Sequence, residues 1–150
     1  METAKREGRQ RLHFLMECIG NTGIRVSEVK YITVEAARAG RTDISLKGKV
    51  RTILIQKKLC RRLLEYAKKR KIRTGCIFLT RTGKELSRKQ IWKEMKSLCR
   101  TSGVMPEKVF HHNLRHLFAV TFYRVVRDIV KLADVLGHSS MLSIYFPSLL

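Results

Sequence analysis

The stretch TDISLKGKVRTILI, residues 42–55, decides the fold class, because it predicts paired strands in a chain otherwise dominated by helical spacing. Two short apolar runs, Ile44 to Leu46 and Ile53 to Ile55, flank the tight turn KGK. Apolar runs on either side of a short glycine-containing turn are typical of a β-hairpin. We therefore expect an antiparallel hairpin with Lys47 near its tip.

On both sides of the hairpin the apolar residues recur at helical spacing. We expect a helix in RQRLHFLMECIG that ends at Gly20, a short helix in RVSEVKYI, a basic helix in KKLCRRLLEYAKKRKI and a helix capped by Ser87. Two more are predicted, from about His112 to Val126 and in DIVKLADVLG, the latter with Asp128 as its N-cap and Gly137 as its stop. The sequence thus predicts an α+β domain, mostly α, with one small antiparallel sheet.

Basic residues far outnumber acidic ones, 32 against 12, which gives a formal net charge of +20. Such an excess indicates a polyanionic partner, with nucleic acid first and an acidic membrane surface second. No apolar run is long enough to span a bilayer, METAKREGRQ lacks the apolar core of a signal peptide, and the four cysteines contain no CxxC pair. We expect one domain over residues 1–150, in the cytoplasm, with reduced and mostly buried thiols.

The tract HHNLRH, residues 111–116, raises the question of a metal site. His112 and His116 have the spacing of a zinc-protease motif, but Asn113 stands where that motif has its glutamate, and Arg115 would repel a cation. We interpret His116, within an apolar stretch, as a hydrogen-bonded core histidine. His112 and Arg115 share a face near the start of a helix, which suits an anion, and the anion expected on a +20 protein is a DNA phosphate.

Other basic and polar residues are candidates for the same site, and each has an ordinary alternative. Arg25 in TGIRVSE can form a surface ion pair with Glu28, and Lys47 can be an exposed turn lysine. His138 in VLGHSS can cap a helix, and Tyr145 follows in SIY. The order of these residues along the chain, with His112 and Arg115 between Lys47 and His138, favours a shared function over separate coincidences.

That order, Arg, Lys, His-x-x-Arg, Gly-His and Tyr, resembles the catalytic domain of the tyrosine recombinases, the phage-integrase family. Four blocks look like that family's motifs: TGIRVSE, LKGKVRTILI, HNLRHLFA and VLGHSS. Within the family they most resemble the integrases of conjugative transposons. The resemblance runs from about Leu12 to Ser140. It implies a DNA breaking and rejoining enzyme that forms a 3′-phosphotyrosine, without metal or any other cofactor.

The resemblance also implies a role for each candidate residue. Arg25 and Arg115 would grip the scissile phosphate, and Glu28 would support Arg25. Lys47 would protonate the departing 5′ oxygen. His112 would be the general base and acid, and His138 would hydrogen-bond the phosphate. Tyr145 would be the nucleophile.

The chain departs from the family pattern at both ends. We expect it to lack the family's N-terminal DNA-clamping domain, and His111 stands where a proline is usual in the family. Tyr145 comes two residues early, with only five residues after it. Since two residues turn a helix by roughly 200°, we expect Tyr145 to lie away from an attacking position and the C-terminal end to be truncated.

The expected partners follow from the charge and from the resemblance: double-stranded DNA, and other recombinase protomers on that DNA, as in the family's tetramer, with weak self-association of the chain alone. A non-cleaving DNA-binding fragment of the same fold and a type IB topoisomerase-like activity are the alternatives. A membrane-surface role for the basic helix in residues 57–73 ranks last, because its apolar face carries Tyr66 as its only bulky aromatic residue.

Overall fold

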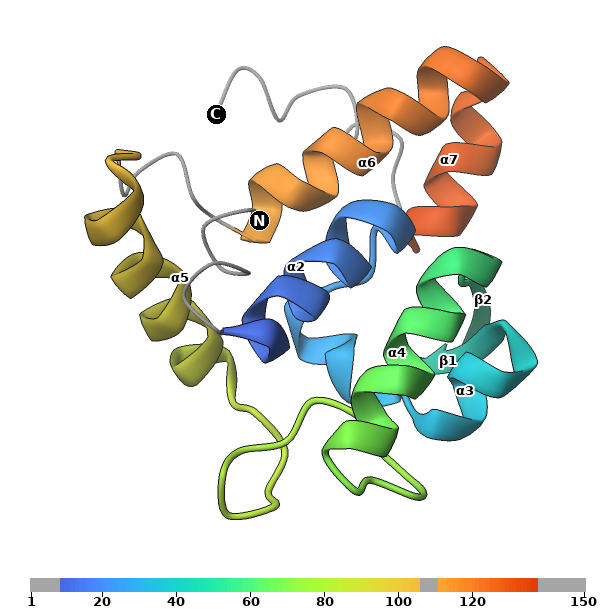
Figure 1. Cartoon of the computed structure of the whole chain (residues 1–150). Helices are drawn as coiled ribbons and strands as arrows, with labels where there is room; N and C mark the ends of the chain where they lie inside the picture. Colours follow the sequence, from blue (N-terminus) through green and yellow to red (C-terminus); the bar gives the residue numbers. More distant parts are fainter. Residues whose placement is uncertain (1–8, 106–110, 138–150) are drawn as a thin grey trace.

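A computed structural model describes residues 9–105 and 111–137, apart from the side chains of residues 111 and 112. Helices make up most of the domain, and one small sheet lies at its edge (Figure 1). In chain order the elements are α2 (Gln10–Thr22), the short 3₁₀ helix η1 (Val26–Tyr31), α3 (Val34–Ala39), β1 (Arg41–Leu46), β2 (Lys49–Leu54), α4 (Lys57–Lys69), α5 (Arg88–Ser102), α6 (His111–Val126) and α7 (Ile129–Leu136). The predicted class, mostly α with one small antiparallel sheet, is confirmed for the described residues.

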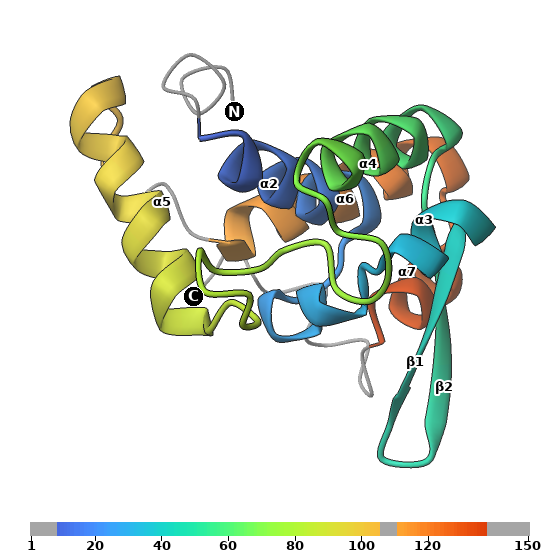
Figure 2. The ribbon, with the colours of Figure 1, turned by 60° about the horizontal axis from the view of Figure 1, so that its bottom comes forward.

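The hairpin forms where the sequence predicts it, and its strands are longer than the two apolar runs. β1 and β2 pair in antiparallel register, from Arg41 opposite Leu54 to Leu46 opposite Lys49. Lys47 and Gly48 form the connecting turn and both have positive φ angles, 51° and 77°. Two positive φ angles give the backbone the twist that a two-residue hairpin turn requires. Figure 2 shows the hairpin projecting well beyond the helices.

The predicted end of the first helix is wrong. α2 continues through Gly20 to Thr22, and Gly23 is the residue that adopts the left-handed conformation, at φ 67°. The Gly23 N–H donates to the Ile19 carbonyl at 2.9 Å, and the buried Thr22 hydroxyl donates to the Cys18 carbonyl at 2.6 Å. These bonds satisfy carbonyls of the last turn. The free energy that they contribute exceeds the helix-propensity cost of Gly20 inside the helix, so α2 continues past it.

The other helix boundaries are closer to the prediction. Ser87 caps α5 in a reciprocal capping box with Gln90. Asp128 caps α7 by accepting from two backbone N–H groups, and Gly137 ends it at φ 66°. The short helix α3, capped by Thr33, is not anticipated by the sequence reasoning, because six residues hold too few apolar positions to show a period.

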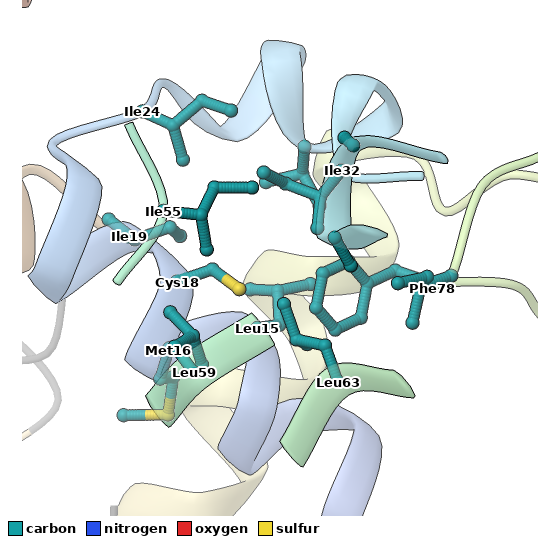
Figure 3. Close-up of a cluster of buried hydrophobic side chains, with 14 of the residues drawn as sticks. Leu15, Met16, Cys18, Ile19, Ile24, Ile32, Ile55, Leu59, Leu63 and Phe78 are labelled. Atoms are coloured by element: carbon teal, nitrogen blue, oxygen red, sulfur yellow. The ribbon is translucent and has the colours of Figure 1, made fainter. Parts of the chain in front are cut away.

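The core lies between α2, α4 and α5 and includes residues of the segments before and after α4 (Figure 3). The residues labelled there are buried and come from far-apart parts of the chain: Leu15, Met16, Cys18, Ile19, Ile24, Ile32, Ile55, Leu59, Leu63 and Phe78. The four cysteines form no disulfide, and Cys76 alone among them is partly accessible. In the described ranges no helix is long and apolar enough to cross a membrane.

Helix α6 packs against α2 through one side only. Leu114, Arg115, Phe118 and Phe122 fall on the same side of the helix and are partly buried. His116 lies on the opposite side and is exposed. The interpretation of His116 as a core histidine is therefore wrong, because the apolar stretch around it reaches the core through its neighbours.

Candidate phosphate-binding site

Arg25 lies directly after α2, at the start of η1, and is held from two directions. Its Nη1 donates to Glu28 Oε1 at 3.1 Å, and its backbone N–H donates to Glu28 Oε2 at 2.9 Å. Its Nη2 donates to the carbonyl of Gly137 at 3.0 Å, across 112 positions of sequence. The predicted Arg25–Glu28 pair is thus present, and it joins η1 to the end of α7 as well.

Arg115 reaches the same place from α6. Its Nη1 donates to the Gly23 carbonyl at 2.6 Å, and its Nη2 donates to the Leu136 carbonyl at 2.5 Å. Arg25 and Arg115 therefore bind the carbonyls of two consecutive residues, Gly137 and Leu136. The structure brings these two predicted arginines together at the C-terminal end of α7.

A third arginine, Arg51 of β2, belongs to this group and is missed by the sequence reasoning. Its Nη2 donates to Glu28 Oε2 at 2.5 Å, and its Nη1 donates to the Leu136 carbonyl. Its side chain is only 10% exposed. Strand alternation was the available signal, because Arg51 shares a face of β2 with the buried Ile53.

Glycine at position 137 lets the Arg51 side chain pack close to the backbone. A Cβ atom there would lie 2.5 Å from Arg51 Nη1 and 3.0 Å from Arg51 Cδ, and the residue has a positive φ angle. The Arg51 guanidinium therefore packs directly against the backbone that ends α7. We refer to Arg25, Glu28, Arg51 and Arg115 as the arginine cluster.

The arginine cluster carries more positive charge than its own carboxylate balances. Glu28 is buried at 6% exposure and faces three guanidinium groups. Burial, followed by the charges of Arg25 and Arg51, lowers the pKa of Arg115 to about 10, and Glu28 acts in the opposite direction. Burial also lowers the pKa of Arg51. Crowded, partly desolvated cations of this kind favour an anion, and guanidinium forks match phosphate oxygens.

The remaining predicted site residues stand differently in the structure. Lys47 is exposed at the hairpin tip, and no salt bridge joins it to another described residue. His112 lies in the first turn of α6, with its side chain outside the described part. His138 and Tyr145 lie outside the described residues, and His138 directly follows Gly137 in the chain. Over residues 9–105 and 111–137, no group of three or more metal-ligating side chains is present.

A family model described as the phage integrase family matches residues 1–147. The chain belongs to the phage integrase family. One relative, tyrosine recombinase XerA of Pyrococcus furiosus, is 32% identical over 127 residues, which cover 80% of this chain and 43% of XerA. The chain therefore spans less than half the length of that family member.

Solved structures of family members share the fold. A structure of XerH site-specific recombinase bound to its difH substrate, a pre-cleavage complex, superposes with a TM-score of 0.75 at 25% identity, covering 91% of this chain and 42% of XerH. The Tn1549 transposon integrase, in complex with transposon right end DNA, gives a TM-score of 0.71 at 16% identity and covers 90% of this chain and 53% of that one. The resemblance to tyrosine recombinases is thus confirmed for this chain's family and fold, and the transposon integrase shares the fold.

Proposed function

We propose that this chain performs the DNA breaking and rejoining of a site-specific recombinase or integrase, with double-stranded DNA as its substrate. The observation that carries the proposal is the meeting of Arg25 and Arg115 on the carbonyls of Gly137 and Leu136, with Glu28 between Arg25 and Arg51. Membership of the phage integrase family supports it, as does the recombinase–DNA complex among the structures of similar fold.

The arginine cluster would act on the phosphate that is cut. In-line attack on a phosphodiester builds negative charge on the equatorial oxygens, and fixed guanidinium groups stabilise that charge without rearranging. Glu28 and the α7 carbonyls hold the guanidinium groups before DNA arrives, which is the preorganisation that such stabilisation needs. We expect no metal or other cofactor, because the arginines supply the charge.

The other proposed residues move protons and form the covalent bond. The Tyr145 oxygen attacks phosphorus while His112 accepts the tyrosine proton, and His138 hydrogen-bonds a phosphate oxygen. The bond from phosphorus to the 5′ oxygen breaks, and Lys47 gives that oxygen its proton. A 3′-phosphotyrosine keeps the energy of the broken bond, so rejoining to another 5′ end needs no ATP.

A non-cleaving DNA-binding module of the same fold is the second candidate function, and the early position of Tyr145 favours it. The cleaving function implies further protomers on the DNA, whereas the binding module does not require them. The names of the similar proteins favour a recombinase over a type IB topoisomerase.

A pool of nicked duplexes with randomised sequence around the nick tests the proposed function. The nick lets the short 5′ fragment diffuse away after cleavage, so the covalent protein–DNA product accumulates. Because Tyr145 comes two residues early, we expect at most a weak covalent band, which disappears in Tyr145→Phe and persists in Tyr123→Phe, where Tyr123 is an exposed tyrosine of α6. Retarded DNA with no covalent band would assign the non-cleaving module instead.

A further inference from the structure

Helix α4 carries a stripe of positive charge that the arginine cluster does not use. Its exposed side chains all lie on one side of the helix, and one of them is acidic, Glu65. Its buried residues lie on the opposite side. With the segment that follows, we define the α4 basic surface by its exposed basic residues: Lys57, Lys58, Arg61, Lys68, Lys69, Arg70, Lys71 and Arg73.

The second half of the α4 basic surface lies at the opposite end of α2 from the arginine cluster, whereas the start of α4 runs alongside the second half of α2, as the Arg62–Glu17 pair shows. Tyr66, near the end of α4, packs its ring 5.2 Å from that of Phe14, in the first half of α2. The arginine cluster begins beyond the other end of α2, which is about 20 Å long for its 13 residues. Figure 2 shows α4 along the upper edge of the domain and the hairpin projecting from the lower edge.

Stability does not account for the basic residues at the start of α4. Lys57 and Lys58 occupy the first turn, where the helix macrodipole disfavours cations, and that turn contains no acidic residue. Arg61 follows at i+4 and i+3 from these lysines, and like charges at that spacing repel. Arg62 is the α4 arginine whose charge is balanced inside the fold, through an ion pair with Glu17.

The chemistry of this surface fits a nucleic-acid backbone better than a membrane. A helix that binds a bilayer needs an accessible apolar face, but Leu59, Leu63, Tyr66 and Ala67 are all buried in the core. With Tyr66 buried, α4 also offers no exposed aromatic ring on which single-stranded bases could stack. Exposed lysines and arginines without stacking groups suit the regularly spaced phosphates of a duplex.

We propose that the α4 basic surface binds a second segment of double-stranded DNA, separate from the duplex at the arginine cluster. The stripe from Lys57 to Lys69 covers about 18 Å of helix. A duplex presents one phosphate charge per roughly 1.7 Å of its axis, so about ten phosphate charges lie alongside that length. This inference goes beyond the proposed function and rests on it only for the place of the first duplex.

A two-duplex capture assay tests the inference. The wild-type chain is bound to an immobilised duplex, and a labelled duplex of unrelated sequence is added over a range of salt concentrations. We expect the wild type to capture the second duplex with a strongly salt-dependent affinity. In Lys57→Gln/Lys58→Gln/Lys68→Gln/Lys69→Gln, we expect the log–log salt slope of capture to shrink by about 3 to 4, since each neutralised phosphate contributes about 0.9.

Two controls separate the α4 basic surface from general charge and from misfolding. Lys84→Gln/Lys89→Gln/Lys93→Gln/Lys131→Gln removes the same charge from exposed lysines elsewhere and should leave capture of the second duplex intact. Glu65→Gln adds one net positive charge to the same face of α4 and should tighten capture. The Glu65 variant keeps the inference testable if the quadruple α4 variant does not fold.

Three results would overturn the inference. The first is capture that persists with an unchanged slope in the quadruple α4 variant, since other protomers or other charges would then hold the second duplex. The second is capture that Glu65→Gln leaves unchanged or weakens. The third is an α4 variant that keeps duplex capture but loses binding to vesicles of equimolar phosphatidylcholine and phosphatidylserine, which would assign the surface to a membrane. None of these results depends on DNA cleavage, so the nicked-duplex experiment reports failure of the proposed function independently of this assay.

Discussion

Replacing Glu28 with glutamine removes the one carboxylate of the arginine cluster and leaves its shape almost unchanged. Glu28 Oε1 accepts from Arg25 Nη1 at 3.1 Å, and Oε2 accepts from Arg51 Nη2 at 2.5 Å. The glutamine amide can accept at its oxygen only, so its NH₂ group would face a guanidinium donor. Both ion pairs are then lost: one guanidinium keeps a neutral hydrogen bond to the amide oxygen, and the other meets a repulsive donor–donor contact.

The expected loss of stability follows from burial. The Arg51 side chain is 10% exposed and that of Glu28 is 8% exposed, so the variant leaves a buried guanidinium without its counter-charge. Removing one partner of a buried pair costs about 3–5 kcal/mol. Arg25 is 33% exposed and can recover solvent, so we expect the lower end, roughly 3 kcal/mol. A chain of this size would lose roughly 10 °C in Tm.

Urea unfolding followed by circular dichroism measures this loss. Glu65→Gln, at an exposed carboxylate, is the matched control and should change the unfolding free energy by less than about 0.5 kcal/mol. Glu28→Gln/Arg51→Gln should be less destabilised than the sum of the single variants by about 1 kcal/mol or more, because neither charge is then left alone. A loss below about 1 kcal/mol for Glu28→Gln, with additive single variants, would refute the argument that Glu28 holds the cluster.

Three further predictions concern Gly23, Cys76 and Glu35. Gly23→Ala should lose roughly 3 kcal/mol in urea unfolding, because the residue has φ 67° and its Cβ would overlap the Phe118 ring and lie 2.9 Å from Leu136 Cδ2; an unchanged midpoint would contradict this close approach. Burial raises the pKa of the Cys18, Cys60 and Cys76 thiols, so iodoacetamide should label the folded protein slowly and Cys76 first, and mass spectrometry that found Cys18 labelled earlier would disprove this order. Hydrogen bonds from its own backbone N–H and from that of Gly75 lower the pKa of Glu35. A carboxyl whose pKa is lower in the folded state stabilises the fold above its unfolded pKa, so the difference in unfolding free energy between wild type and Glu35→Gln should shrink as pH falls below about 4.3. A constant difference across that range in urea titrations would argue against these bonds.

Local signals predicted most of the fold. The hairpin was predictable because apolar runs on both sides of a Lys-Gly turn leave few other backbone solutions, and α5 and α7 were predictable because Ser87 and Asp128 are strong caps. Gly20 and His116 were misplaced because the sequence around each does not show how α2 and α6 pack. The hydroxyl of Thr22 and the Gly23 N–H carry α2 past Gly20, and the side of α6 that meets α2 excludes His116.

The candidate site was predictable only in part. Arg25 and Arg115 lie within sequence blocks that resemble the family's motifs, and both side chains bind carbonyls at the end of α7. Arg51 was missed because a lone arginine in a strand shows nothing of the buried Glu28 beside it, 23 positions earlier in the chain. Its partner carbonyl belongs to Leu136, and such a contact is set by tertiary packing. The roles of Lys47, His112, His138 and Tyr145 stay predictions.

Phosphate binding at the arginine cluster tests the central claim most directly. The measurement is a titration of the folded chain with inorganic phosphate, followed by NMR of the arginine Nε–H groups and compared with a chloride titration at equal ionic strength. We predict that the Arg25 and Arg115 signals shift together with one saturating curve, and that Arg25→Gln weakens the Arg115 response whereas Arg124→Gln, at an exposed arginine of α6, does not. Shifts confined to exposed arginines, with Arg25 and Arg115 unmoved or moving independently, would contradict a shared phosphate site.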